Sequence, residues 1–372
     1  MARRFRVSLH TVQRWVKRAQ GKRLDRVDWH DGPPGPKQAA HRTPPAIEAL
    51  LLKRRQVLQE KSDLGEFGAL AVQQSLKQEG VEELPSVRTI GRIFVRRGLL
   101  DGRERIRHKA PPPGWYLPEV AARLCELDQV DTTEGLKIKD GPLVEVLNLV
   151  SLYGGLVGSF PRQASLTTPI IVEALIAHWQ EWGLPGYAQF DNDTLFQGPH
   201  QHPDAIGRVI RLCLSLEIIP VFVPPREMGF HASIEHYNGQ WQAKVWTRFE
   251  HTSLAALQQQ SDRYVKAHRL RSAPRRESAP PRQPFPQDWR LDLQAPARGQ
   301  IVFIRRTNPQ GEASLLGHVF PVDSQWAGRL VRGEVLLDDG CIRFYQLRRR
   351  APKEQPLLHE VPYRWPHKPF RE

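Results

Sequence analysis

Three short acidic blocks contain the residues of this sequence whose types and spacing could do chemistry. They are Gln129-Val-Asp131-Thr-Thr133, Gln189-Phe-Asp191-Asn192 and Ser233-Ile-Glu235-His-Tyr-Asn238. Carboxylate oxygens are the ligands that hard Mg²⁺ ions prefer. Two such ions about 3.5–4 Å apart activate the attacking oxygen and stabilise the leaving oxygen in a displacement at phosphorus. Carboxylates brought together from these blocks would suit metal-dependent phosphoryl transfer.

The elements around the acidic blocks are predicted to form an α/β domain with a mixed sheet. An Asp140-Gly141 hairpin signal joins the first two of its strands. Strands are expected over 136–138, 143–149, 155–160, 187–190 and 218–223. Helices are expected over 169–182, 203–216, 233–249 and 254–268. Three strands followed by alternating helices and strands are typical of a sheet that helices cover.

Basic helices before this domain are predicted to bind DNA. Ser8 is expected to cap a helix with Leu9, Val12, Trp15 and Val16 at helical spacing, and Arg14 on it would contact DNA. This segment resembles a helix-turn-helix without its first helix, which an upstream start codon would explain. A second module has helices at 46–60, 67–79 and 86–98, and its last helix turns Arg88, Arg92 and Arg96 away from the apolar face.

The chain after the α/β domain is predicted to contain a Pro/Arg-rich linker and a small barrel. Its strands are expected at 301–305, 313–319, 330–337 and 341–347. The predicted domains are 1–30, a partial helix-turn-helix; 31–45, a linker; 46–110, a helix-turn-helix DNA-binding domain; 124–270, the α/β core; 271–298, a linker; 299–350, an SH3-like β-barrel; and 351–372, a basic tail.

The composition indicates a polyanionic partner. The chain has 54 Lys and Arg residues against 40 Asp and Glu residues, for a net charge of +14. Such a charge favours binding to phosphate backbones. The three cysteines lie far apart, which fits neither a disulfide framework nor a zinc site and indicates a reducing cytosol. The sequence lacks a long apolar run, so no membrane association is expected.

The acidic blocks resemble the catalytic motifs of the integrase and insertion-sequence transposase families of the DDE type, which include retroviral integrases. In those families the first Asp lies on the first strand with Thr two places on. The second Asp follows the fourth strand in an Asp-Asn-Gly turn, and the Glu begins a helix as Glu-x-x-Asn. The resemblance covers about residues 126–250, and the flanking modules are also similar to the flanks of such enzymes.

The resemblance implies an RNase H-like core with Asp131, Asp191 and Glu235 as catalytic and metal-binding residues. Asp131 would bridge two Mg²⁺ ions, with Mn²⁺ as an alternative, while Asp191 and Glu235 would each hold one ion. The implied activity is nicking of transposon ends and transfer of the freed 3′-hydroxyl into target DNA. The implied partners are double-stranded DNA and further copies of the chain, and the implied location is the cytoplasm, on the bacterial nucleoid.

Several positions depart from the family pattern. Between Asp191 and Glu235 lie 43 residues, more than usual, which predicts an insertion over 197–204. Asp193 replaces the usual glycine of the turn. Asp128 is a rival for the first carboxylate, although strand parity turns it to the face opposite Asp131.

Two further basic positions are DNA-binding candidates. By resemblance, His231, four residues before Glu235, would lie near the DNA, and an exposed loop histidine is the alternative. Lys244 follows Glu235 later than the family's usual basic residue. Two other functions compete with the enzyme: a DNA-binding protein of the same descent that is no longer catalytic, and a nuclease of the RNase H or resolvase kind without strand joining.

Overall fold

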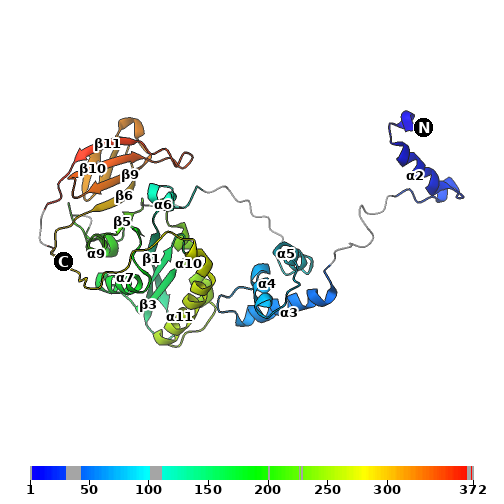
Figure 1. Cartoon of the computed structure of the whole chain (residues 1–372), viewed down its shortest axis with the longest axis horizontal. Coiled ribbons are helices and arrows are strands. Elements are labelled where there is room, and N and C mark those ends of the chain that lie inside the picture. Colours follow the sequence, from blue (N-terminus) through cyan, green and yellow to red (C-terminus); the bar gives the residue numbers. More distant parts are fainter. Residues whose placement is uncertain are drawn as a thin grey trace. The chain divides into compact units, whose positions relative to one another are not determined.

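The computed structural model describes residues 2–30, 43–100, 111–199, 202–225, 227, 229–366 and 370 (Figure 1). The chain divides into two compact units. The first unit contains Met1–Arg55 and Gly68–Leu100, and the second contains Gln56–Phe67 and Asp101–Glu372. None of the described helices combines the length and the apolar character needed to cross a lipid bilayer.

The first unit begins with the basic helix predicted from the sequence. Helix α1 (Ala2–Phe5) is followed by α2 (Leu9–Ala19) and by a 3-10 turn, η1 (Leu24–Arg26). The Ser8 hydroxyl accepts a hydrogen bond from the Thr11 N–H at 3.1 Å, so the predicted cap is confirmed. Helix α2 buries none of its residues against the rest of the described chain.

Three further helices pack around a small apolar core in the first unit. They are α3 (Pro45–Lys61), α4 (Ala69–Gln78) and α5 (Val87–Arg96), at the three predicted places. Ser86 caps α5 through the Thr89 N–H at 3.3 Å, as predicted. The core contains Leu51, Val72, Leu76, Ile90, Ile93 and Phe94. Because Ile90, Ile93 and Phe94 occupy one face of α5, its basic residues lie on the other face.

The second unit is built on a mixed sheet, as the sequence predicts. The antiparallel strands β1 (Leu127–Lys137), β2 (Leu143–Ser151) and β3 (Val157–Gln163) form one part of it. Strands β4 (Tyr187–Phe190) and β5 (Ile219–Phe222) lie parallel to β1 on its other side. The intervening helices are α7 (Thr168–Trp182), α8 (Thr194–Gln197) and α9 (Arg208–Ser215).

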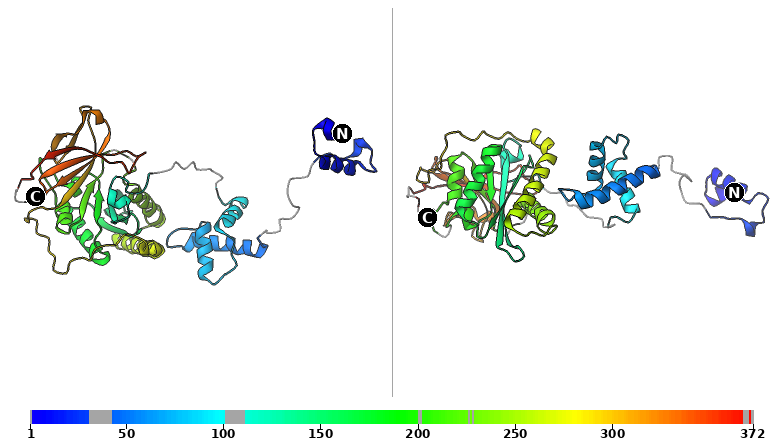
Figure 2. Two further views of the ribbon diagram at one scale, coloured as in Figure 1. Left: turned by 45° about the horizontal axis from the view of Figure 1, so that its top comes forward. Right: turned by 90° about the horizontal axis from the view of Figure 1, so that it is seen from below.

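Helices cover both faces of this sheet (Figure 2). On β2, Leu147 and Leu149 pack in the cluster that contains α7 and α9. Val144, Val146 and Val150 pack instead with α10 (Ala232–Trp241) and α11 (Leu254–Arg271). Odd and even residues of a strand point to opposite faces, so the doubly apolar sequence of β2 is explained by burial on both sides. Between α10 and α11 lies a π-helical turn, η2 (Gln242–Trp246).

The strands predicted to form a barrel continue the central sheet. Strand β6 (Gln300–Arg306) pairs in parallel with β5, and the full order is β11-β10-β9-β6-β5-β4-β1-β2-β3. Strands β7 (Glu312–Leu315) and β8 (His318–Pro321) form a separate hairpin, and η3 (Ser324–Trp326) leads to β9 (Leu330–Leu336) and β10 (Cys341–Gln346). The sequence did not predict this continuity, because a strand's local pattern does not identify a parallel neighbour about 80 residues away.

Two segments expected to be a linker and a tail contain ordered structure. Within 271–298, α11 extends to Arg271, α12 (Ala273–Glu277) follows, and Gln283 forms a β-bridge with Leu184. Within 351–372, β11 (Leu357–Pro362) pairs with β10. Most of the β11 side chains are exposed, which is typical of an edge strand and gave no apolar alternation to detect.

The helix after the predicted insertion is shorter than expected. The helix expected over 203–216 is α9, which starts only at Arg208 because Gly207 occupies its N-cap position. The described part of the preceding loop is held by the C-terminal strands. The Asp204 carboxylate contacts His318 Nε2 at 2.7 Å and accepts a hydrogen bond from the Tyr363 hydroxyl at 2.8 Å.

Candidate active site

The three carboxylates predicted to act together lie on adjacent elements of the second unit. Asp131 lies on β1, and Asp191 is the first residue after β4. Strands β1 and β4 are parallel neighbours, with Gln129 beside Gln189. Both strands therefore run in the same direction at these positions. Glu235 lies in the first turn of α10, a helix that packs on β1 and β2. The topology therefore directs all three carboxylates to one region.

The charges of the other two carboxylates act on Asp131. Burial raises the pKa of Asp131, and the charges of Asp191 and Glu235 raise it further, to about 6. Hydrogen bonds from the Thr132 N–H and the Asn238 amide act in the opposite direction. The pKa of Asp191 is also raised, first by burial and then by the charges of Asp193 and Glu134. The cluster thus carries excess negative charge, which a cation would stabilise.

Asp131 is held in place by both of its carboxylate oxygens. Oδ1 accepts from the Thr132 N–H at 2.9 Å, and Oδ2 accepts from the Asn238 side-chain amide at 2.8 Å. Asn238 lies three residues after Glu235 on α10, one turn along the same face. The Glu-x-x-Asn pattern therefore joins the strand that carries Asp131 to the helix that carries Glu235.

Two glutamines fix the start of the helix that carries Glu235. The side-chain amides of Gln129 and Gln189 both donate to the Phe230 carbonyl, at 3.0 Å and 2.8 Å. Gln129 also accepts from the Ile234 N–H at 3.1 Å. No role for these glutamines was predicted from the sequence. The signal was the repeated Gln-x-Asp, in which each glutamine lies two residues before a candidate carboxylate, on the same face of its strand.

The turn that carries Asp191 is anchored from two directions. The Asp193 N–H donates to Asp191 Oδ1 at 3.0 Å, and Asp193 itself caps α8 through the Leu195 N–H at 2.8 Å. The Asn192 amide donates to the Val223 carbonyl at 2.6 Å, beyond the end of β5. Asp193 is therefore an exposed capping residue of the turn.

Arg305, from the C-terminal strand β6, completes this anchor. Its Nη2 donates to Asn192 Oδ1 at 2.8 Å. The remaining guanidinium hydrogens donate to the carbonyl oxygens of Phe222, Val223, Ile304 and Ser314. Burial lowers the pKa of Arg305 to about 10. Arg305 was not predicted from the sequence, because its partners Asn192, Phe222 and Val223 lie far from it in the chain.

Replacing Arg305 with methionine is expected to lower the free energy of unfolding by about 3 kcal/mol, because several buried carbonyls lose their donor. Urea unfolding followed by circular dichroism measures this loss. The neighbouring Arg306 is exposed, so Arg306→Met is expected to cost less than about 1 kcal/mol. Equal losses in the two variants would show that Arg305 does not anchor the turn.

Asp128, the rival first carboxylate, lies in a different environment. It is fully buried, and both of its oxygens accept from Arg282, at 2.8 Å and 2.7 Å. Ser151 and the Trp179 indole also donate to it, at 2.7 Å and 3.1 Å. Trp179 belongs to α7 on one face of the sheet, whereas Asp131 bonds to α10 on the other. The predicted opposite orientation is therefore confirmed, and Asp128 has no oxygen left for a ligand.

Three predicted DNA contacts have other environments in the structure. His231 is 7% exposed, so the exposed loop histidine considered as an alternative is wrong, and so is a position open to DNA. The Lys244 ammonium donates to the Gly65 carbonyl at 2.9 Å and lies near the Phe67 ring. Arg96 is bound to Glu48 of α3 at 2.9 Å, but its side chain is 49% exposed, so its contact with DNA stays a prediction. Local sequence does not predict burial or long-range contacts of this kind.

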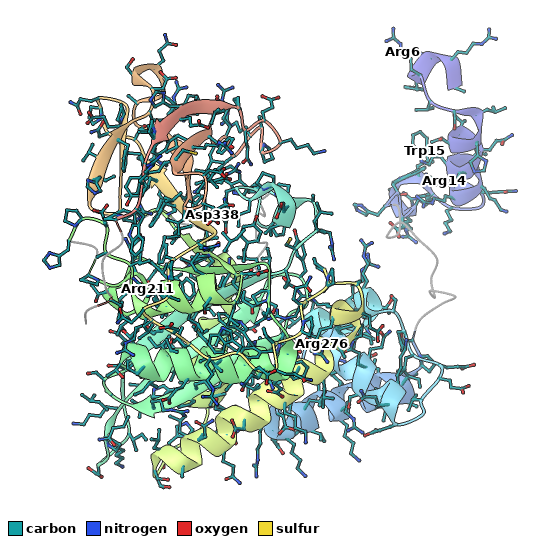
Figure 3. The ribbon with its side chains drawn as sticks, turned by 60° about the vertical axis from the view of Figure 1, so that its left-hand side comes forward. Arg6, Arg14, Trp15, Arg211, Arg276 and Asp338 are labelled. Carbon is teal, nitrogen blue, oxygen red and sulfur yellow. The ribbon has the colours of Figure 1, made fainter. Side chains whose placement is uncertain are left out.

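The other predicted DNA contacts lie on the surfaces of their helices. Arg88 and Arg92 are exposed on α5, opposite its buried face. Arg14 is exposed on α2, next to Trp15 (Figure 3). These three arginines stay candidates for contact with phosphates.

Two buried histidines, His178 and His231, and the partly buried His268 predict a loss of stability in mild acid. Burial lowers the pKa of His178 to about 3, and it lowers those of His231 and His268 to about 4. The unfolded chain takes up protons near pH 6.5, whereas the folded chain does not until pH 3–4. The free energy of unfolding should therefore fall as the pH drops from about 6.5 to about 4.

Urea unfolding at several pH values measures this dependence. We expect a slope approaching that of three protons, about 4 kcal/mol per pH unit at most. His178→Leu should remove about one proton, because the nitrogens of His178 have no hydrogen-bond partner in the part of the chain that the structure describes. Parallel pH profiles for the two proteins would contradict this assignment.

The donor set suits a hard divalent cation, since all three candidate ligands are carboxylates. Glu235 is exposed, and no three carboxylate, imidazole or thiolate groups among the described residues are grouped closely enough to hold an ion together. Carboxylates without a neutralising cation repel one another, which favours a wider spacing of their side chains.

Comparisons with known proteins identify no family: no family model and no curated protein matches the chain. The simian T-cell lymphotropic virus intasome in complex with PP2A regulatory subunit B56 gamma is 13% identical, with 78% of this chain and 94% of that chain covered and a TM-score of 0.34. The HTLV-2 integrase catalytic core domain in complex with magnesium is 15% identical, with 37% and 82% covered and a TM-score of 0.27. The BIV integrase catalytic core domain is 19% identical, with 36% and 79% covered and a TM-score of 0.27.

Proposed function

We propose that this chain cuts and joins DNA as a polynucleotidyl transferase of the integrase and transposase type, with an RNase H-like core. The observation that carries the proposal is the placement of three carboxylates on neighbouring elements: Asp131 lies on β1, Asp191 directly follows the parallel strand β4, and Glu235 lies in the first turn of α10, which packs on β1. Asp191 and Glu235 both raise the pKa of Asp131, although the three residues are far apart in the sequence. Structural carboxylates are usually paired with cations, as Asp128 is with Arg282, whereas this cluster has no cation among its neighbours that shift its pKa values.

Asp131, Asp191 and Glu235 would hold Mg²⁺, with Mn²⁺ as an alternative. The bound ions would activate the attacking oxygen and stabilise the leaving oxygen in an in-line displacement at phosphorus. The chain's own residues orient the ligands. Thr132 and Asn238 fix the Asp131 carboxylate, and the Asp193 N–H fixes that of Asp191. Gln129 and Gln189 hold the start of the helix that carries Glu235.

The reaction needs no nucleophile from the protein. In the first step, water attacks a backbone phosphorus, the P–O bond to the 3′-oxygen breaks, and a 3′-hydroxyl is freed at the end of the element. In the second step, that hydroxyl attacks a phosphorus of the target DNA and displaces a target 3′-oxygen. Joining both ends of an element requires more than one active site, so the chain would act as a multimer on DNA.

The basic helices of the first unit would bring DNA to this chemistry. Arg88 and Arg92 project from one face of α5, and Arg14 projects from α2. Guanidinium groups at these places would neutralise phosphates and position the duplex without any direct reading of sequence.

The proposal is tested by incubating the purified full-length protein with labelled duplexes that carry the DNA flanking its gene. We expect nicks and strand-transfer products with Mg²⁺ or Mn²⁺, and none with EDTA. Binding of the duplex without nicking under any of these metal conditions would overturn the enzymatic function.

A second candidate is a DNA-binding protein of the same descent that no longer catalyses. It is favoured by the exposed position of Glu235 and by the absence of a close three-ligand group among the described residues. The two functions differ in their dependence on Asp191. A pure binder would keep its biological effect after Asp191→Asn, and the enzyme would lose it.

A further inference from the structure

A buried tyrosine lies before the first strand of the second unit, in a segment that belongs to neither of the predicted domains around it. Tyr116 and its neighbour Trp115 are 2% and 3% exposed, and they lie just before α6 (Pro118–Ala121). Both pack in an apolar cluster with residues of β1, β4, β5, β6 and β9. The segment upstream of the predicted core is therefore part of that core.

The main chain of this segment is held by the C-terminal part of the chain. The Tyr116 carbonyl accepts a hydrogen bond from Arg332 of β9 at 3.0 Å. The Trp115 carbonyl accepts one from the Gln355 side-chain amide at 2.8 Å. Arg332 is buried, so its hydrogen bond is shielded from water. The Tyr116 side chain is therefore presented from a fixed backbone.

The Tyr116 hydroxyl orients the side-chain amide of Gln189. Gln189 Oε1 accepts a hydrogen bond from this hydroxyl, which also lies 3.2 Å from the Phe230 carbonyl oxygen. Gln189 Nε2 donates to the same carbonyl at 2.8 Å. Burial raises the pKa of Tyr116 above that of an exposed tyrosine, so the hydroxyl keeps its hydrogen. A flipped Gln189 amide would bring Oε1 against the Phe230 carbonyl, and two acceptors repel each other.

Phe230 connects these contacts to the helix that carries Glu235. Its carbonyl also accepts from the Gln129 amide at 3.0 Å, and its ring packs on that of Tyr116 with the centroids 4.8 Å apart. The next residue, His231, is the N-cap of α10, and its carbonyl accepts from the Glu235 N–H at 2.9 Å. A shift of Phe230 would therefore reach Glu235 within one helical turn.

We propose that Tyr116 is a positioning residue for the proposed metal site. Its hydroxyl orients Gln189, Gln189 holds the Phe230 carbonyl, and this contact fixes the start of the helix that carries Glu235. Residues behind a ligand tune a metal site because they hold the ligand in its binding orientation. This inference rests on the proposed function for the role of Glu235 as a metal ligand.

Tyr116→Phe keeps the ring and removes only the hydroxyl. In hydrogen–deuterium exchange of the full chain, the backbone amides of 230–235 should exchange about tenfold faster, because loss of one buried hydrogen bond eases local opening. Calorimetric titration of the full chain with Mn²⁺ alone, without DNA, should show an affinity about tenfold weaker, because the ligand on α10 is held less firmly.

Tyr187→Phe is the matched control. Tyr187 is buried on β4 in the same apolar cluster, and its hydroxyl donates to Glu119 Oε2 at 2.9 Å. The control therefore loses a comparable hydroxyl contact that is not made to Gln189 or Phe230. It should leave both the exchange at 230–235 and the Mn²⁺ affinity nearly unchanged.

A second variant shows whether the hydroxyl acts through Gln189. In a Gln189→Met background, Tyr116→Phe should have little further effect on Mn²⁺ affinity. A further loss as large as in the wild-type background would contradict the proposed route.

Three results would overturn the proposal. They are unchanged exchange at 230–235 in Tyr116→Phe, a Mn²⁺ affinity that is equal in this variant and the wild type or absent from both, and an equal loss in Tyr187→Phe. Because neither measurement involves DNA cleavage, both can fail while the enzymatic function holds, and both can succeed while nicking is absent.

Discussion

Replacing Asp191 with asparagine is expected to lower the rate of Mg²⁺-dependent DNA nicking by about a thousandfold, since loss of several kcal/mol of transition-state stabilisation has that effect. The proposed role of Asp191 depends on its negative charge. An asparagine side chain keeps the shape and can still accept the Asp193 N–H that now binds Asp191 Oδ1. The turn should therefore persist while the charge is lost.

Asp193→Asn is the matched control for this variant. Asp193 is exposed, and its side chain caps α8 through the Leu195 N–H, a role that asparagine fills about equally well. Both variants lose one negative charge within the same turn. Only Asp191→Asn should lose nicking, while both should retain affinity for the duplex.

Single-turnover nicking assays with excess protein measure the chemical step separately from release of the product. A rate for Asp191→Asn within tenfold of the wild-type rate would show that Asp191 is not a metal ligand. An equal loss in Asp193→Asn would indicate that the turn, and not the Asp191 charge, matters for the reaction.

Replacing Asp128 with asparagine is expected to lower the free energy of unfolding by about 3–5 kcal/mol, because it leaves the Arg282 charge buried without its partner. The side chain of Asp128 is 1% exposed and that of Arg282 is 15% exposed. The pair also joins β1 to the segment after α12. Its loss would therefore loosen a connection between parts of the chain that are 154 residues apart.

The acid dependence of stability provides a second measurement of the same pair. Burial alone would raise the pKa of Asp128, but the charge and hydrogen bonds of Arg282 lower it to about 2, from an ordinary value of 3.8. A lowered pKa stabilises the fold above the unfolded value, and that contribution disappears as the pH falls from about 4 to about 2. About 2 kcal/mol of acid-sensitive stability should be absent from Asp128→Asn.

A double-mutant cycle completes the test of this pair. Asp128→Asn with Arg282→Met should be less destabilised than the sum of the single changes, since neither partner then leaves an uncompensated charge. The exposed pair of Arg343 and Glu360, 2.6 Å apart, is the control, and its loss should change stability much less. Additive effects at Asp128 and Arg282 would contradict a coupled buried pair.

Local sequence determined the elements of this protein well where burial on one face produces a regular pattern. The caps at Ser8 and Ser86, the three helices α3, α4 and α5, and the mixed sheet follow from hydrogen-bonding side chains and apolar periodicity. The alternation of side chains along a strand also predicted that Asp128 and Asp131 point to opposite faces of β1. The catalytic roles of Asp131, Asp191 and Glu235 stay predictions, which the Asp191→Asn assay tests.

Only the tertiary structure decided which partners those side chains have. Asp128 and Asp131 are both aspartates on one strand, yet one accepts hydrogen bonds from Arg282 and the other accepts a hydrogen bond from Asn238. Arg305 anchors the Asp191 turn from β6, and β11 continues the sheet at its far edge. These outcomes depend on parallel pairing and on contacts between segments distant in the chain. Local propensity and periodicity describe one segment at a time, so they predict the elements and faces but not the partners.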